Sequence, residues 1–166
     1  MKKYVSCIMM LAMMAVVCST FTACGGGDSD DDIPGDVVKT TTGVHRIEVT
    51  FSGNTTGWEG QIMFIATNGK SYNVPLYRDG NLLSTDGGYS TEELKNITID
   101  TEKTCDLMQV SVTLMNMSHR TVSPVTVTLK GYVNGVQKNM KVVEFPATET
   151  LKTIIFYSEN IGADLI

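Results

Sequence analysis

A strict two-residue alternation of apolar and polar side chains is the feature that most constrains the fold of this chain. It runs through the segments 44–51, 108–114 and 125–129, where an apolar residue such as Val110 precedes a polar one such as Ser111. A period of two places alternate side chains on opposite faces of a β-strand, whereas a helix repeats every 3.6 residues. One apolar and one polar face are typical of strands in antiparallel sheets. The chain is therefore predicted to be all-β.

Turn signals predict how neighbouring strands are joined. Asn68-Gly69 and Asn134-Gly135 favour type I′ hairpins, because both central positions of that turn need a positive φ. The predicted hairpins pair 58–67 with 70–77, and 124–133 with 136–145.

The number of strands and their spacing predict the architecture. Ile62–Ala66 is apolar throughout and predicts a central strand covered on both faces, while 78–95 is expected to be irregular, with at most one helical turn capped by Ser90. The expected strands are 44–52, 58–67, 70–77, 96–101, 106–117, 124–133, 136–145 and 150–157. About eight short strands predict a two-sheet antiparallel sandwich, immunoglobulin-like in architecture, with a small closed β-barrel as the alternative. The irregular stretch favours the sandwich, because a barrel needs continuous pairing.

The first 23 residues differ in composition from the rest of the chain. Lys2 and Lys3 precede the apolar run Val5–Val17, a layout typical of a secretory signal. That run is shorter than the roughly 20 residues that span a bilayer. We therefore expect residues 1–23 to be a signal peptide, with an uncleaved membrane helix as the alternative.

The sequence Phe21-Thr22-Ala23-Cys24 resembles the lipobox of bacterial lipoproteins, in which a small residue directly precedes an obligatory cysteine. The resemblance covers residues 1–32 and implies cleavage before Cys24 by signal peptidase II, with a diacylglyceryl group on its sulfur. The glycines and aspartates that follow are similar to the export signal of Bacteroidetes-type surface lipoproteins. The resemblance implies an outer membrane lipoprotein at the cell surface, with the periplasmic face as the alternative.

Residues 24–42 are expected to form a flexible acidic tether that joins the lipid to a β-sandwich domain at 43–166. Three glycines follow the cysteine and leave the backbone free, and four nearby aspartates repel one another and stay solvated. Removing the signal peptide, which carries two lysines, changes the net charge from −5 to −7. Without a basic patch, nucleic acid is not expected as a partner.

Few residues in the sequence indicate catalysis or metal binding. Once Cys24 is lipidated, Cys105 has no disulfide partner, and we expect it to be a small buried core residue. His45 is expected at the rim of the first strand and His119 in solvent. The chain lacks HExxH, nucleophile-elbow, P-loop and dinucleotide motifs. We therefore expect no cofactor and no enzymatic activity.

Six residues are candidates for ligand binding. Tyr77, Asp79, Asn81, Asp86 and Tyr89 lie in or next to the 78–95 stretch, and Trp58 follows the turn at 52–57. Flat rings stack on sugar faces, but the single tryptophan has the parity of Ile62 and Phe64 and is expected in the core. The polar side chains offer oxygens to calcium, yet EF-hand spacing needs a ligand where Leu83 stands, so turn chemistry explains them better.

These expectations lead to two functional hypotheses. The first is a lipid-anchored cell-envelope binding or structural module that contacts a glycan or another envelope protein through loops or a free sheet edge. The alternative is a small surface hydrolase with carboxylates in 78–93, because glycoside hydrolysis needs two carboxylates beside a cleft. Exposed rings on a concave patch favour sugar binding, and a long unpaired edge favours assembly.

Overall fold

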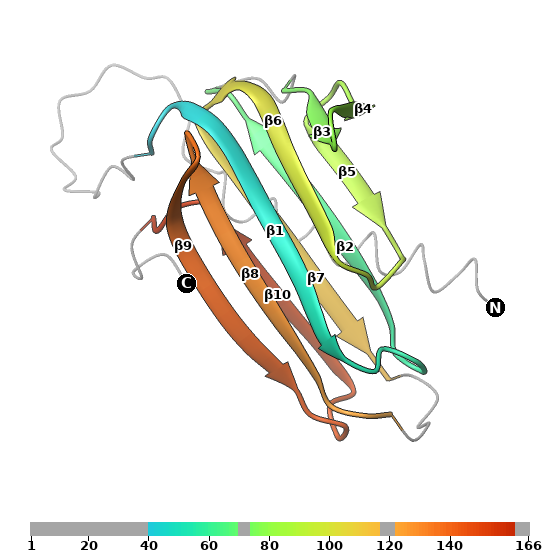
Figure 1. Ribbon diagram of the computed structural model, residues 1–166. Helices are drawn as coiled ribbons and strands as arrows, with labels where there is room; N and C mark the ends of the chain where they lie inside the picture. The colour runs from blue at the N-terminus through green and yellow to red at the C-terminus, as the bar shows by residue number, and fades with distance from the viewer. Residues whose placement is uncertain (1–39, 70–73, 117–121, 162–166) are drawn as a thin grey trace, which may run out of the picture. The chain divides into compact units, whose positions relative to one another are not determined.

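The alternating segments form ten β-strands in the computed structural model, which describes residues 40–69, 74–116 and 122–161 (Figure 1). The strands are β1 (Gly43–Gly53), β2 (Glu59–Thr67), β3 (Leu76–Arg78), β4 (Asn81–Ser84), β5 (Gly88–Thr91), β6 (Ile97–Cys105), β7 (Leu107–Met115), β8 (Val125–Val133), β9 (Val136–Phe145) and β10 (Leu151–Tyr157). The described ranges contain no helical segment with the length and hydrophobicity of a membrane span. The predicted signal peptide and Cys24 lie outside the described residues.

The strands form two antiparallel sheets in two layers (Figure 1). One sheet has the order β4-β3-β6-β1-β8-β9, and the other has the order β10-β7-β2-β5. Each sheet has its own edge strands and does not close on itself. The predicted sandwich is therefore confirmed, and the closed-barrel alternative is wrong.

The inward side chains of the two sheets form an apolar core. β1 contributes Ile47 and Val49, and β2 contributes Ile62 and Phe64, all of them buried. Burying each such side chain stabilises the fold by about 1.5–3 kcal/mol. Cys105 is also buried without a disulfide partner, as predicted, and burial raises the pKa of its thiol to about 11. A thiol that stays protonated at neutral pH is a packing residue and not a nucleophile.

The hairpin predicted at Asn68-Gly69 is wrong. β2 pairs with β7 and β5, whereas the chain after this turn leads to β3, which pairs with β6 and β4 in the other sheet. An Asn-Gly pair reports only local backbone geometry. The partners of β2 are chosen instead by the need to cover the apolar run Ile62–Ala66, whose predicted central position is confirmed.

The second predicted hairpin is confirmed, since β8 and β9 are joined through Asn134 and Gly135 with φ values of 51° and 77°. The expectation for 78–95 is wrong, because this stretch contains β4 and β5. Ser90 lies in β5 opposite Met63 and does not cap a helical turn. Strands of four residues carry too little alternation to be recognised without their neighbours.

His45 is fully buried, so the prediction that it lies at a rim is wrong. Its Nε2 donates to the Thr41 carbonyl at 2.9 Å, which leaves Nδ1 to accept from the Ser158 hydroxyl at 2.6 Å. The backbone N–H of Thr41 donates to Glu159 Oε1 at 2.7 Å. These contacts tie the start of β1 to the segment after β10. Burial lowers the pKa of His45, because the charged form loses its hydration.

The same corner depends on a glycine in β8. A Cβ atom at Gly131 would overlap the backbone of Ser158, whose own N–H donates to the Met108 carbonyl at 2.9 Å. Main chain held by a hydrogen bond cannot move aside without breaking it. The absence of a side chain at residue 131 therefore lets the segment after β10 cross β8.

Gly131→Ala is expected to lower the free energy of unfolding by about 1–3 kcal/mol, the usual cost of overpacking. The matched control is Gly88→Ala in β5, where an added Cβ meets nothing within 4 Å. Chemical denaturation of both variants measures the difference. Equal stability of the two variants would contradict the close approach at Gly131.

The free energy of unfolding is expected to fall as the pH drops below 6.5, the ordinary pKa of histidine. Because the folded-state pKa of His45 is lowered, the unfolded chain binds the proton first and is stabilised by it. One such proton gives a slope of at most about 1.4 kcal/mol per pH unit. Denaturation series of the wild type and His45→Gln measure this slope, and the curve of the variant should be flatter below pH 6.5. Parallel curves for the two proteins would contradict the assignment.

Candidate functional site

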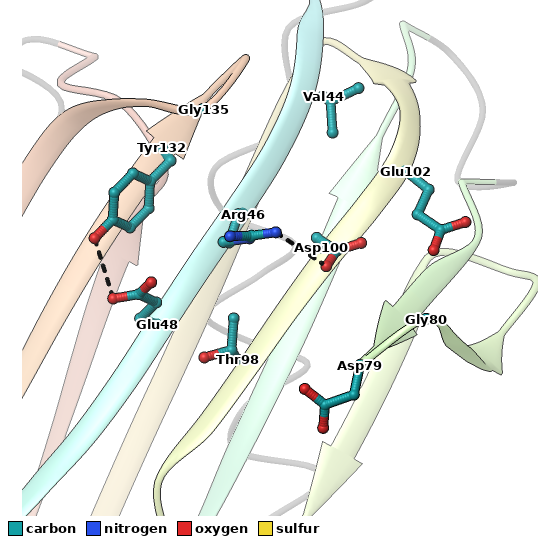
Figure 2. Close-up of a pocket in the computed structure, with 10 residues that line it drawn as sticks. All are labelled: Val44, Arg46, Glu48, Asp79, Gly80, Thr98, Asp100, Glu102, Tyr132 and Gly135. Atoms are coloured by element: carbon teal, nitrogen blue, oxygen red, sulfur yellow. Dashed lines mark hydrogen bonds and ion pairs between the residues drawn. The ribbon is translucent and has the colours of Figure 1, made fainter.

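A polar groove of about 630 Å³ lies on the outward face of the six-stranded sheet (Figure 2). Strands β8, β1 and β6 supply most of it, and the β3–β4 and β8–β9 turns complete it. The lining residues are Val44, Arg46, Glu48, Asp79, Gly80, Thr98, Asp100, Glu102, Tyr132 and Gly135. Most belong to regular strands, so hydrogen-bonded backbone positions their side chains.

The register of four strands sets three of these side chains in one row with Tyr77, which lies beside the lining. Arg46 of β1 lies opposite Tyr132 of β8 and opposite Asp100 of β6. Asp100 in turn lies opposite Tyr77 of β3. Directly opposed residues of antiparallel strands place their side chains on the same face. The row therefore reads tyrosine, arginine, aspartate, tyrosine across β8, β1, β6 and β3.

Two polar contacts organise the groove (Figure 2). Arg46 Nη2 lies 3.7 Å from Asp100 Oδ2, and the Tyr132 hydroxyl donates to Glu48 Oε2 at 3.1 Å. Arg46 is half exposed, so this ion pair contributes at most about 1 kcal/mol to stability. The Arg46 guanidinium has five N–H donors, more than this one ion pair uses. Burial and the adjacent Glu48 carboxylate raise the pKa of Tyr132. Its hydroxyl therefore remains protonated at neutral pH.

The charged side chains of the groove are mainly acidic. Glu48, Asp79, Asp100 and Glu102 contribute four carboxylates against the single guanidinium of Arg46. Over the ranges that the structure describes, no three His, Cys, Asp or Glu side chains lie close enough together to hold a metal ion. Carboxylates accept hydrogen bonds and repel anions. The lining therefore suits a ligand that is rich in hydrogen-bond donors and carries no negative charge.

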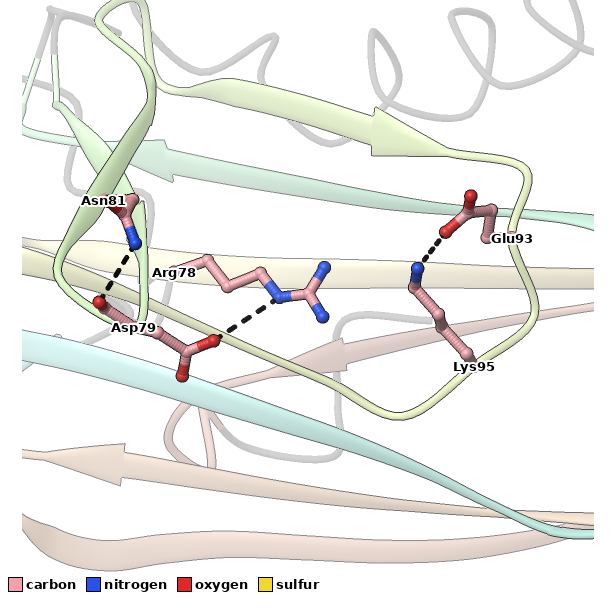
Figure 3. Close-up of polar contacts among 5 residues, drawn as sticks. All are labelled: Arg78, Asp79, Asn81, Glu93 and Lys95. Atoms are coloured by element: carbon pink, nitrogen blue, oxygen red, sulfur yellow. Dashed lines mark hydrogen bonds and ion pairs between the residues drawn. The ribbon is translucent and has the colours of Figure 1, made fainter.

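Three of the six predicted ligand-binding residues lie beside this groove. Tyr77, Asp79 and Asn81 belong to the β3–β4 hairpin, and Figure 3 shows the last two. Asp79 Oδ2 lies 3.7 Å from Arg78 Nε, and Asn81 Nδ2 donates to the Asp79 carbonyl at 3.2 Å. Asp79 and Gly80 have φ values of 51° and 74°, so turn chemistry does account for these residues. The Asp79 carboxylate remains exposed at the side of the groove.

Trp58 lies away from the groove and in the core. Its side chain is 6% exposed, its Nε1 donates to the Ser123 carbonyl at 2.9 Å, and its ring meets Phe145 edge-on at 6.4 Å. The core interpretation of this tryptophan is therefore confirmed, and its buried ring has no free face for a sugar.

The last two predicted residues also lie apart from the groove. The Tyr89 ring lies 6.5 Å from that of Phe64 and packs against the core from β5. Asp86 closes the β4–β5 turn, where it accepts hydrogen bonds from the Ser84 hydroxyl and the Gly88 N–H. The first of these bonds is the main cause of a lowered Asp86 pKa.

Sequence reasoning missed the residues that form the groove floor. Arg46, Glu48, Thr98, Asp100 and Tyr132 are outward positions of alternating strands, and that alternation was visible. The alternation did not predict that these residues are neighbours. They become neighbours because β1 pairs with β6 and β8, which follow it in the chain by about 50 and 80 residues. A search for polar outward positions on every strand would have found these residues, but it would not have shown that they lie together in one groove.

No protein-family model and no curated protein matches this chain. Among solved structures, a DUF4425 family protein from Bacteroides ovatus is 22% identical, with a TM-score of 0.64 over 74% of this chain and 100% of its own. A DUF4425 domain of unknown function from Bacteroides vulgatus is 20% identical, with a TM-score of 0.62 over 72% and 98%. The calcium-bound form of a protein from Parabacteroides distasonis is 18% identical, with a TM-score of 0.57 over 77% and 99%. At such identities the likeness shows the fold alone.

Proposed function

We propose that this chain is a lipid-anchored binding module of the cell envelope, and that the polar groove holds a neutral glycan. The observation that carries the proposal is the row of Tyr132, Arg46, Asp100 and Tyr77, in which two rings flank an ion pair. A sugar presents apolar C–H faces to rings and pairs of hydroxyls to carboxylates and guanidinium groups. The groove volume of about 630 Å³ falls within the roughly 300–1,000 Å³ of small-ligand sites.

The charge of the groove supports neutral glycans over acidic ones. Four carboxylates and one guanidinium make the lining net negative. A sulfated or uronic sugar would meet like charges, whereas a neutral sugar donates its hydroxyl protons to them.

Two carboxylates of 78–93 disfavour the hydrolase alternative. Hydrogen bonding from Ser84 lowers the pKa of Asp86, and Lys95 lowers that of Glu93 through a hydrogen bond and an ion pair (Figure 3). A general acid at a glycosidic bond needs a raised pKa instead. The two groups are better suited to closing turns, which supports binding over catalysis.

Calcium is a second candidate ligand, suggested by the calcium-bound structure from Parabacteroides distasonis. Carboxylate oxygens are the ligands that calcium prefers, and the groove has four such groups. Calcium binding is disfavoured because, within the described part of the chain, no three acidic or histidine side chains lie close enough together to share an ion. We therefore propose direct contact between sugar and side chains, with a chelator as the deciding control.

Tyr132→Ala, Arg46→Ala and Tyr77→Ala are each expected to weaken glycan binding at least tenfold, or by about 1.4 kcal/mol. Each removes a stacking surface or a charged hydrogen-bond donor from the row. An array of neutral glycans identifies the ligand, and calorimetry with that glycan measures the affinities.

The matched control is Thr128→Ala, which lies on the same face of β8 but outside the groove lining, opposite Thr50. Its affinity should equal that of the wild type, and a calcium chelator should change nothing. Full affinity in Tyr132→Ala and Arg46→Ala would refute the groove as the site. A loss of binding with the chelator would show that an ion bridges protein and sugar.

The proposed anchor is the sulfur of Cys24, supported by the likeness of residues 21–24 to a lipobox. Two acyl chains on one residue suffice for stable membrane attachment. Cys24→Ser is expected to move the protein from the membrane fraction to the soluble fraction, and Cys18→Ser serves as the matched control that stays anchored. Mass spectrometry of the wild type should find a diacylglyceryl group on an N-terminal Cys24. An unmodified thiol there would contradict the anchor.

A further inference from the structure

One edge of the six-stranded sheet is long enough to accept another strand. The two sheets end in four edge strands, of which β4 and β5 have four residues each, β10 has seven and β9 has ten (Figure 1). Very short edge strands resist pairing with another chain, because they offer few free backbone groups. At ten residues, β9 is long enough for such pairing.

The first part of β9 is already occupied by the chain itself. Asn139 Nδ2 donates to the carbonyls of Tyr157 and Glu159, at 3.0 and 3.4 Å, and Lys138 forms a β-bridge with Glu159. Beyond this point, from Met140 to Glu144, no strand of the described residues pairs with the outer side of β9. The open edge is therefore the segment 140–144.

Hydrogen bonding of β8 decides which backbone groups of β9 point outward. The Asn134 N–H donates to the Val44 carbonyl, so even-numbered positions of this segment face β1. In an antiparallel sheet, alternate residues bond to opposite neighbours. The odd-numbered positions of β8, such as Leu129, therefore bond to β9, and their partner there is Lys141.

It follows that Met140, Val142 and Glu144 direct their backbone N–H and C=O groups away from the sheet. An independent contact agrees, because Lys152 Nζ donates to the Glu144 carbonyl at 3.2 Å from outside β8 and β9. These three outward positions form the hydrogen-bonding template that an added strand needs, and an incoming strand would take the place of Lys152 at the Glu144 carbonyl.

The side chains of this open edge define what such a strand must contain. Met140 and Val142 are 51% and 56% exposed, on the outer face of the sheet. Lys141 lies between them on the inner side, directly opposite the buried Leu129. An added strand alternates with the same period of two. It would set apolar residues beside Met140 and Val142 and an acidic residue beside Lys141.

The charge around the edge points the same way. Lys138, Lys141 and Lys152 lie along it, against the one carboxylate of the open segment, Glu144, and within the described ranges none of the three lysines forms an ion pair. A second copy pairing edge to edge would bring these lysines together, which disfavours self-association. An acidic partner strand is favoured by the same charges.

We propose that residues 140–144 of β9 bind an extended acidic segment of a partner protein, in which apolar and acidic residues alternate, as an added β-strand. The interaction is independent of the groove, because β9 contributes no residue to the groove lining. Its failure would leave the glycan proposal intact.

The test uses the full chain and the synthetic peptide acetyl-Thr-Val-Glu-Val-Glu-Val-Thr-amide. On binding, amide hydrogen exchange at Met140 and Val142 should slow at least tenfold, since both N–H groups gain acceptors. A peptide with lysine in place of each glutamate should bind at least tenfold more weakly, because it would meet the edge lysines.

Lys141→Glu should weaken the glutamate peptide at least tenfold and strengthen the lysine peptide. The matched control is Lys103→Glu, an exposed lysine of β6 away from the edge, which should change neither affinity. Val142→Pro removes one outward N–H and should abolish binding of both peptides. If that variant fails to fold, the charge reversal at Lys141 still decides the proposal.

Four results would overturn it. The first is that the glutamate peptide does not bind, and the second is that the two peptides bind equally well. Protection of Met140 and Val142 that grows with protein concentration alone would identify a second copy as the occupant. Protection without peptide that disappears when Asp28, Asp30, Asp31 and Asp32 are replaced by Asn would identify the chain's own acidic segment.

Discussion

The alternation of β1 in the interior of the six-stranded sheet is the constraint on which both the core and the groove depend. Its inward residues Ile47 and Val49 enter the core, and its outward residues Arg46 and Glu48 enter the groove. A slip of one residue against β6 or β8 would bury the two charges and expose the two aliphatic side chains. The energy that buries the core therefore also holds the groove side chains in place.

The corner around His45 shows how this sheet is joined to its partner at one end. A fully buried imidazole has both nitrogens satisfied, by Ser158 and by the Thr41 carbonyl, so its burial is compatible with a stable core. Gly131 lets the segment after β10 approach closely enough to make these bonds. The result ties the start of the sandwich to its last described segment with polar contacts that apolar packing alone would not specify.

Two surfaces of one sheet carry opposite charge. Carboxylates dominate the groove over β8, β1 and β6, while lysines follow the edge at β9. The two surfaces suit different ligands. The groove suits a ligand with hydroxyl donors, and the edge suits an extended segment with acidic side chains. The two proposed interactions, with a sugar and with a partner strand, are compatible with the proposed attachment to an envelope through residues 24–42, since a flexible tether lets both surfaces reach their ligands.

The sequence by itself determined the strand periodicity, the all-β class, the Asn134-Gly135 hairpin and the burial of Trp58 and Cys105. These follow from local rules, namely which face a residue occupies and which φ a turn requires. Only the tertiary structure decided that β3 leaves β2 for the other sheet, that His45 is buried, and that Arg46 lies between Tyr132 and Asp100. Strand pairing across 50 or more residues is chosen by the total burial of many side chains, and no local pattern encodes that sum.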